Sequence, residues 1–140
     1  MPEITLLSKA GAMHTTAGLN WGSNALNHTR AYDSYIPLHI ETIRSYPNIF
    51  DKKPANPEII NFHWDDGTVM PGLFEGNGPD GYPKQISSHP HKDIMGKYFR
   101  QRLNLPSNRR ISLQDLNNYG RTTVTIERID RLNYRLDFSV

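Results

Sequence analysis

Along several short stretches of the chain, apolar and polar residues alternate in the way that predicts β-strands. Residues 58–64 are the clearest case, because every second side chain is apolar and would lie on one face of a strand. These apolar residues are Ile60, Phe62 and Trp64. The pair Asp66 and Gly67 then predicts a tight hairpin turn, with a return strand over residues 69–75. The pattern therefore predicts a β-hairpin near the middle of the chain.

The C-terminal residues alternate in the same way. Residues 122–129 and 134–140 are both rich in β-branched and aromatic residues, and polar residues near 130–133 separate them. This pattern predicts a second hairpin that packs one face against the core.

Three other segments have the spacing of short amphipathic helices. Pro37 is expected to begin the first, because its fixed φ suits the first helical turn. The second is expected over residues 93–103. The third helix has the clearest start and stop signals. Ser112 to Asp115 resembles a capping box, and Gly120 stands where a helix commonly ends.

Two long polar segments, residues 17–35 and 76–91, show neither the alternation of a strand nor the spacing of a helix, and are expected to be loops. The whole pattern amounts to six or seven short strands, paired in hairpins, and two or three short helices. It predicts a mainly β protein with short helices, either an antiparallel barrel or a sandwich with helices at its ends. We expect a single domain over residues 17–140, preceded by a lead-in segment over residues 1–16.

Composition limits the class of protein further. The chain has 140 residues, 36% of them hydrophobic, and a mean hydropathy of -0.64, which suits one domain with one core. It has no cysteine, which excludes disulfides and thiolate zinc sites. It has no apolar run long enough to span a membrane, and its first residues do not resemble a secretory signal. We therefore expect a cytoplasmic protein that is not bound to a membrane.

Positive charge is concentrated in the second half of the chain. Residues 1–70 contain 5 basic and 7 acidic residues, whereas residues 71–140 contain 11 basic and 7 acidic residues. Within residues 81–110, seven basic residues accompany a single acid, Asp93. In a protein of formal net charge +2, such a block is typical of a surface that faces a polyanion. A solvated helix face would have the same composition.

Known catalytic motifs are mostly absent, since neither a phosphate-binding glycine loop nor a nucleophilic serine elbow occurs. Two short patterns leave a small metal-dependent nuclease open as an alternative. Asp51 and Lys53 fit the end of a nuclease Asp/Glu-x-Lys motif, and His89 and His91 alternate as metal ligands can. Neither pattern has the additional ligands that a metal site needs, so we expect no metal and no other cofactor.

The two polar loops contain the types of side chain that can read DNA. Arg and Lys pair with guanine, Asn and Gln pair with adenine, and Lys and Arg neutralise phosphates. The candidates in the first loop are Asn20, Trp21, Ser23, Asn24, Asn27, His28, Arg30, Asp33 and Tyr35. The candidates in and after the second loop are Lys84, Gln85, Ser87, Ser88, His89, Lys92 and Lys97, with Arg100 and Arg109 as further phosphate ligands.

Four blocks of the sequence resemble the C-terminal part of the NgoFVII-type restriction endonucleases. The first block has two parts, residues 18–22 (GLNWG) and 31–37 (AYDSYIP), and the other three blocks are residues 95–106 (MGKYFRQRLNLP), 115–125 (DLNNYGRTTVT) and 134–139 (YRLDFS). The resemblance extends over residues 17–140, and the order and spacing of the blocks make it specific.

This resemblance implies a seven-stranded open β-barrel, the B3-like DNA-binding pseudobarrel. It implies that two arms, residues 18–35 and 76–92, project into the major groove of double-stranded DNA. In that family the nuclease is a separate phospholipase-D-like domain, which we expect this chain to lack. The expected function is therefore that of a monomeric specificity domain, which does not cleave DNA alone and has a nuclease domain or subunit as its partner.

One further interpretation remains open beside the nuclease. Trp21 and Trp64, together with the tyrosines, could form an aromatic platform that binds protein or carbohydrate.

Overall fold

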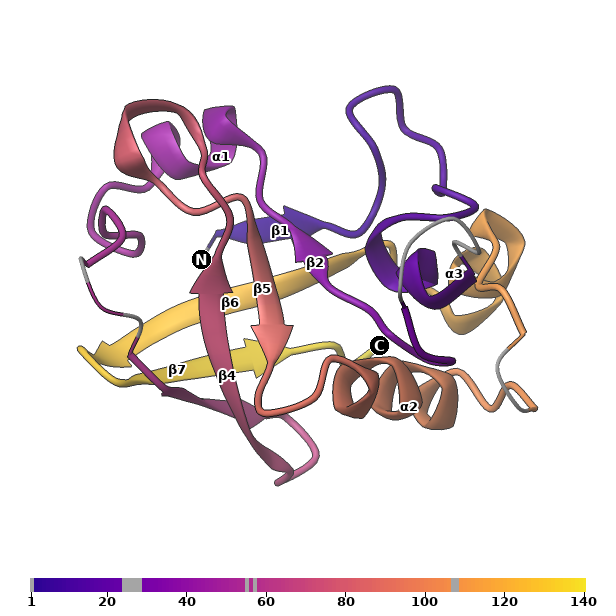
Figure 1. Ribbon diagram of the computed structural model, residues 1–140. Helices are drawn as coiled ribbons and strands as arrows, with labels where there is room; N and C mark the ends of the chain where they lie inside the picture. The colour runs from indigo at the N-terminus through magenta and orange to yellow at the C-terminus, as the bar shows by residue number, and fades with distance from the viewer. Residues whose placement is uncertain (1, 24–28, 55, 57, 107–108) are drawn as a thin grey trace.

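Seven strands form one sheet in the computed structural model, which describes residues 2–23, 29–54, 56, 58–106 and 109–140. They are β1 (Glu3–Thr5), β2 (Ile36–Pro37), β3 (Ile60–Trp64), β4 (Val69–Glu75), β5 (Gln85–Ser88), β6 (Thr123–Asp130) and β7 (Asn133–Asp137). The strands pair in the order β1-β6-β7-β3-β4-β5-β2 and curve into a nearly closed barrel with β1 and β2 at its open edges (Figure 1). The expected mainly β fold, an open seven-stranded barrel, is confirmed.

Both predicted hairpins are present. β3 and β4 are joined by a turn in which Gly67 has a φ of 90° and the Trp64 N–H donates to the Thr68 carbonyl over 2.9 Å. β6 and β7 form the C-terminal hairpin, with Ile126 opposite Leu136. The alternating apolar residues of β3 are all buried: Ile60, Phe62 and Trp64.

Two expectations about the sheet are wrong. The strands do not pair only in hairpins, because β3 and β7 run parallel, with Phe62 opposite Tyr134. Residues 85–88, expected within a loop, form β5, in which Ile86 is fully buried opposite Phe74 of β4. The strand has a single large apolar residue, so its sequence does not show the alternation that marks the others.

Short helices lie beside the barrel: α1 (Ile40–Ser45), α2 (Asp93–Arg102), α3 (Leu113–Tyr119) and the 3-10 turns η1 (Gly18–Ser23) and η2 (Pro79–Gly81). The second and third predicted helices are confirmed, and α3 has the expected capping box of Ser112 and Asp115 and ends at Gly120. The first helix begins later than expected. Pro37 pairs within β2, and Leu38 still donates to the segment before β5, so the backbone stays extended up to residue 39.

The N-terminal residues take part in the barrel. The expected lead-in segment, residues 1–16, contains β1, which pairs antiparallel with β6. Ile4 and Leu6 are 0% and 1% exposed, so this segment contributes to the core.

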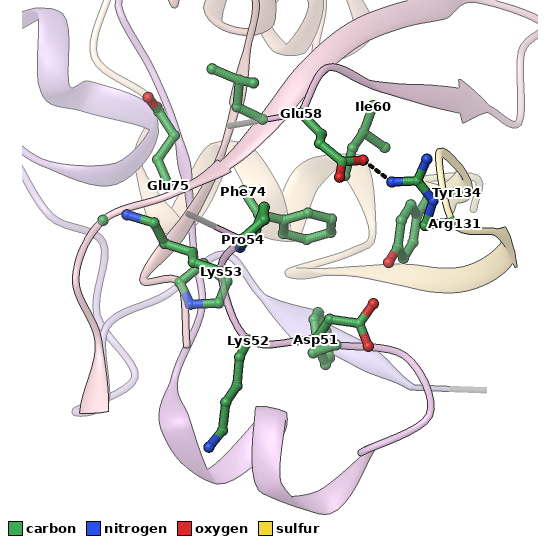
Figure 2. Close-up of a pocket in the computed structure, with 14 residues that line it drawn as sticks. Asp51, Lys52, Lys53, Pro54, Glu58, Ile60, Phe74, Glu75, Arg131 and Tyr134 are labelled. Carbon is green, nitrogen blue, oxygen red and sulfur yellow. Dashed lines mark hydrogen bonds and ion pairs between the residues drawn. The ribbon is translucent and has the colours of Figure 1, made fainter. Parts of the chain in front are cut away.

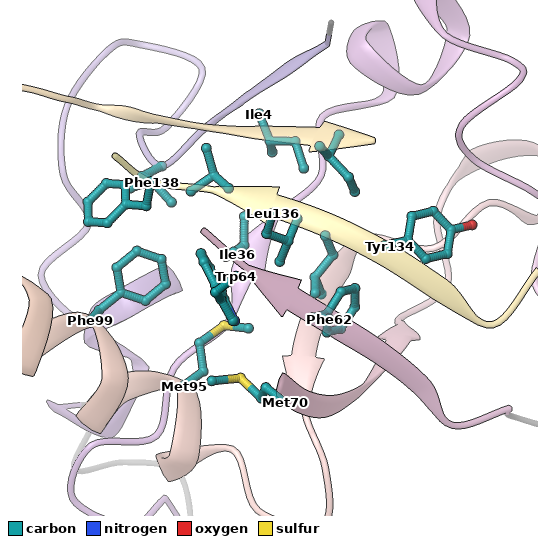
Figure 3. Packing of buried hydrophobic residues seen from close by; sticks show 14 of the residues in the cluster. Ile4, Ile36, Phe62, Trp64, Met70, Met95, Phe99, Tyr134, Leu136 and Phe138 are labelled. Carbon is teal, nitrogen blue, oxygen red and sulfur yellow. The ribbon is translucent and has the colours of Figure 1, made fainter. Parts of the chain in front are cut away.

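One hydrophobic core fills the barrel and continues beneath α2 (Figure 3). Towards one end, the Phe74 and Tyr134 ring centroids lie 5.1 Å apart. Beneath α2, the Phe99 ring lies 5.6 Å from Trp64 and 5.1 Å from Phe138, both in edge contact. Burial of each such side chain stabilises the fold by about 1.5–3 kcal/mol, so α2 is fixed to the barrel by its apolar face.

The Arg102 side chain joins the elements around this part of the core. Its guanidinium contacts both carboxylate oxygens of Asp65, at 3.0 and 2.9 Å, and donates to the hydroxyls of Tyr98 and Tyr119. The Asp65 carboxylate also accepts from the Phe138 N–H over 2.8 Å. Burial alone would lower the pKa of Arg102, but the hydrogen bonds with Asp65 and the tyrosines raise it. One side chain therefore connects α2, α3, the β3–β4 turn and the C-terminal segment.

We predict that Arg102→Met lowers the free energy of unfolding by about 1–3 kcal/mol, because it removes the hydrogen bonds that Arg102 donates to Asp65, Tyr98 and Tyr119. Urea unfolding followed by circular dichroism measures this change. Arg110→Met is the matched control, since Arg110 is exposed, and it should change the stability by less than about 0.5 kcal/mol. Equal effects of the two substitutions would contradict the role given to Arg102.

Candidate nucleic-acid interface

The first polar loop is anchored to the body of the protein through Asn20 of η1. This residue is 1% exposed. Its Nδ2 group donates to the carbonyls of His14 and Ile111, over 2.7 and 2.8 Å, and its Oδ1 accepts from the Ile111 N–H over 2.8 Å. Both donors of the amide are therefore used within the protein. Asn20 therefore holds the loop in place. It is not free to read a base, although the sequence analysis gave it that role.

Asp33 closes the same loop. It is 9% exposed, and its carboxylate accepts from the Arg30 N–H over 2.8 Å. The Asp33 N–H donates to the Arg30 carbonyl, and the Asp33 carbonyl accepts from the Gly22 N–H over 2.7 Å. Asp33 thus has a structural role, whereas the Arg30 residue itself is exposed. Ser23 is half-buried at the end of η1, and the candidates Asn24, Asn27 and His28 lie outside the described residues.

A glycine allows α2 to lie directly on this loop. A Cβ atom at Gly96 would be 1.7 Å from the Tyr32 carbonyl oxygen and 2.6 Å from Ser34 Oγ. The Ser34 hydroxyl donates to the Leu19 carbonyl over 2.7 Å, and the Ser34 N–H donates to the Lys92 carbonyl over 3.2 Å. The second part of the loop is therefore held between η1 and α2.

Aromatic rings and lysines lie together where η1 meets α2. Trp21 and Tyr35 are in edge contact, with ring centroids 6.0 Å apart. Lys92 Nζ lies 5.8 Å from the Trp21 ring, and Lys97 Nζ lies 5.6 Å from the ring of Tyr32. These cation–π contacts hold the ammonium groups at defined positions on the surface.

Each of these two lysines also has a carboxylate partner. Lys92 Nζ lies 3.1 Å from Glu75 Oε1, and Lys97 Nζ lies 3.4 Å from Asp93 Oδ2. Burial alone would raise the pKa of Glu75, but hydrogen bonds from Ser87 and Lys92 hold that pKa below its usual value. Glu75 is therefore ionised at neutral pH and offsets much of the charge of Lys92.

The second polar segment contains both buried and accessible residues. Ser87 and Ser88 in β5 are 0% and 3% exposed. The Ser88 hydroxyl donates to the His91 carbonyl over 2.6 Å and accepts from the Met95 N–H over 3.0 Å, so it caps the first turn of α2. Ser87 Oγ accepts from Gln85 Nε2 over 3.2 Å. The two serines connect β5 with its surroundings and do not face solvent, which differs from the expectation.

Two connections project on the same side of the barrel (Figure 1). They are the β1–β2 connection, residues 6–35, and the β4–β5 connection, residues 76–84. A groove lies over β2 and the start of β5, between these connections. The side chains that line it include Lys9, Tyr35, Pro37, His39, Lys84 and Gln85. Tyr35, Lys84 and Gln85 were predicted from the sequence, and the structure brings them together.

Lys9 and His39 are the polar residues of this groove that the sequence did not indicate. Lys9 is exposed, and its Nζ lies 3.7 Å from Glu41 Oε1. His39 Nε2 lies 3.0 Å from the Leu7 carbonyl oxygen, which links the segments next to the two edge strands. Only recognition of β1 as a barrel strand would have placed Lys9 beside the other candidates.

The remaining predicted residues differ in accessibility. Arg100 is 4% exposed, its Nε donates to the Arg109 carbonyl over 3.0 Å, and burial lowers its pKa. It has no access to a phosphate, contrary to the expectation. Arg109 is exposed but lies 2.6 Å from the Asp115 carboxylate. His89 is half-buried, and its N–H donates to the Pro71 carbonyl over 2.9 Å.

The residues that suggested a metal-dependent nuclease or an aromatic platform are not arranged as either function needs. Trp64 is 3% exposed and cannot belong to a surface platform. The Asp51 carboxylate lies 2.7 Å from Arg128. Among the described residues, no group of three His, Cys, Asp or Glu side chains is placed to hold a metal ion. No helix in the same part of the chain is long and apolar enough to cross a membrane.

Comparison with known proteins gives one family. The model of the NgoFVII C-terminal B3-like DNA-binding domain matches residues 2–130, which include β1, both projecting connections and α2. No curated protein matches the chain significantly.

We predict that Gly96→Ala destabilises the protein by about 1–3 kcal/mol, although alanine favours helix, because the Cβ atom overlaps the Tyr32 carbonyl. Amide hydrogen exchange should quicken at Ser34, whose N–H bonds to α2 through Lys92. Gln101→Ala, at an exposed position of the same helix, is the control and should leave that exchange unchanged. Unaltered exchange at Ser34 in the Gly96 variant would contradict the close packing.

Proposed function

Because this chain belongs to the family of NgoFVII C-terminal B3-like DNA-binding domains, we propose that it binds double-stranded DNA in a sequence-specific manner. The observation that carries the proposal is the groove between the two projecting connections, where Tyr35, Lys84 and Gln85 lie on one surface. In this proposal the connections are arms that enter the major groove, and the domain supplies the specificity of a restriction endonuclease.

Three exposed lysines are the proposed phosphate ligands, two of them on the groove and Lys97 on α2. Lys84 is exposed, and no acidic partner for it occurs among the described residues. Lys9 and Lys97 do have carboxylate partners, but both lysines are more than half exposed. Exposed ion pairs stabilise a protein by only about 0–1 kcal/mol, so a phosphate can compete for these ammonium groups.

Polar side chains on the arms are the proposed base ligands. The Gln85 amide can pair with adenine, and the Arg30 guanidinium can make a two-point contact with guanine. Asn24, Asn27 and His28 lie between Ser23 and Arg30 in sequence and keep their place in the proposal on their chemistry. Four of the residues predicted from the sequence are buried and are proposed to position the arms: Asn20, Asp33, Ser87 and Ser88.

Cleavage is assigned to a separate nuclease domain or subunit. The proposed domain acts as a monomer in the cytoplasm, needs no cofactor and does not cleave DNA alone. A pseudobarrel with two different arms suits an asymmetric site, because no second copy is required to complete the surface.

We predict that Arg30→Ala and Lys84→Ala reduce DNA binding in different ways. Loss of a base contact should cost about 1–3 kcal/mol on the preferred duplex and relax the preference at one base pair. Loss of a phosphate contact should weaken binding to all duplexes alike and reduce the salt slope by about one. Fluorescence anisotropy with the preferred and a scrambled duplex at several salt concentrations separates these outcomes.

Arg135→Ala is the control for both variants, since Arg135 lies on β7 and pairs there with Glu127. Its affinity and salt slope should equal those of the unaltered protein. The same pattern of loss for Arg30→Ala and Lys84→Ala would contradict the assignment of one to a base and the other to a phosphate.

We also predict that Glu75→Gln strengthens DNA binding several-fold, because it removes the carboxylate that neutralises Lys92. The gain should be the same for every duplex and should steepen the salt dependence by about one phosphate contact. Glu127→Gln, which frees Arg135 on β7 instead, is the matched charge control. Equal gains from the two substitutions would indicate a general effect of net charge and would contradict the position given to Lys92.

A further inference from the structure

A separate cavity lies beside the base of the β4–β5 connection, which contributes Gly76 and Pro83 to its lining (Figure 2). Its volume is about 270 Å³. It is formed by β3, β4, β7 and the segment over residues 50–54, and it shares no lining residue with the groove between the arms. The proposed DNA contacts leave this cavity unassigned.

Aromatic side chains make the floor of the cavity. Phe74 lies at its centre, with the Tyr134 ring centroid 5.1 Å away and the Phe50 centroid 6.3 Å away, both in edge contact. Phe50 and Tyr134 are each 2% exposed, and the Tyr134 hydroxyl donates to the Ile49 carbonyl over 3.1 Å. These rings are therefore fixed by the core, and the cavity exists without a ligand. Faces and edges of aromatic rings favour a flat aromatic guest.

The acidic groups around the mouth of the cavity are all neutralised. Asp51 pairs with Arg128, and Glu75 pairs with Lys92. Glu58 pairs with Arg131 across the upper edge of the cavity, as Figure 2 shows. No carboxylate at the mouth is thus left to attract a cation.

The lysines at the mouth are not neutralised in this way. Lys53 Nζ donates to the uncharged Asn77 amide oxygen over 3.2 Å, and Lys52 Nζ lies 6.0 Å from the Tyr82 ring. Neither lysine has an acidic partner among the described residues. The mouth therefore has a surplus of positive charge, while the floor is apolar.

We propose that this cavity binds a small flat aromatic molecule, of one or two rings, that has a carboxylate or sulfonate group. The rings occupy the space beside Phe74 and Tyr134, and the anionic group lies at the mouth near Lys53. Binding cavities for small molecules usually measure about 300–1,000 Å³, and the volume here, about 270 Å³, lies just below that range and suits a small ligand. The inference does not depend on the proposed DNA binding.

Three probes with the same naphthalene ring and substituents of similar size test the proposal: 1-naphthoate, 1-naphthalenemethanol and 1-naphthylmethylamine, which are anionic, neutral and cationic near neutral pH. Each is titrated into the full chain and followed by two-dimensional amide NMR. We expect saturable shifts centred on Ile60, Phe74 and Tyr134, and about tenfold tighter binding of the anion than of the cation.

Lys53→Glu should remove or reverse the preference for the anion and still allow the neutral probe to bind, which shows that the cavity remains folded. Arg110→Glu makes the same charge change at an exposed site away from the cavity lining and should keep the preference. Equal affinities of the unaltered protein for the three probes, shifts located elsewhere, or the same response of both variants would overturn the proposal. DNA binding is measured separately, so neither result decides the other.

Discussion

The close approach of α2 to the first loop at Gly96 is the constraint on which the arrangement of the proposed DNA-binding surface depends. No side chain fits between the helix and the Tyr32 carbonyl. The same helix is capped by Ser88 at the end of β5 and held from below by Phe99. One short helix therefore fixes the second part of the β1–β2 connection and the strand that follows the β4–β5 connection. The first arm is therefore attached to α2 directly, whereas the second is connected to the helix through β5.

The positive charge of the chain acts through its placement. Among the basic residues between 81 and 110, Arg100 and Arg102 are used to hold α2 and its neighbours together. Lys92, Lys97 and Arg109 each have a carboxylate partner. Lys84, on the groove, keeps its full charge. In the proposed complex, a protein of small net charge contacts phosphates with a few ammonium groups at fixed positions, which would set its register on the duplex.

Much of the fold could be predicted because local physics decides it. Alternation in residues 58–64, the turn at Gly67 and the capping box at Ser112 each act over a few residues. β5 and the parallel pairing of β3 with β7 could not be predicted, because they depend on contacts between distant segments. The same limit applies to the proposed site: the sequence made Lys84 and Gln85 candidates, and both line the groove, but it could not distinguish the exposed Arg30 from the buried Asn20, or place Lys9 in the groove.

Selection from a pool of random duplexes, repeated at two salt concentrations without divalent metal, tests the central claim most directly. We expect enrichment of one short asymmetric sequence and an affinity that falls as the salt concentration rises. Binding without enrichment would contradict sequence-specific recognition and leave only a basic surface. Absence of binding at low salt would contradict the assignment of a DNA-binding function to this domain.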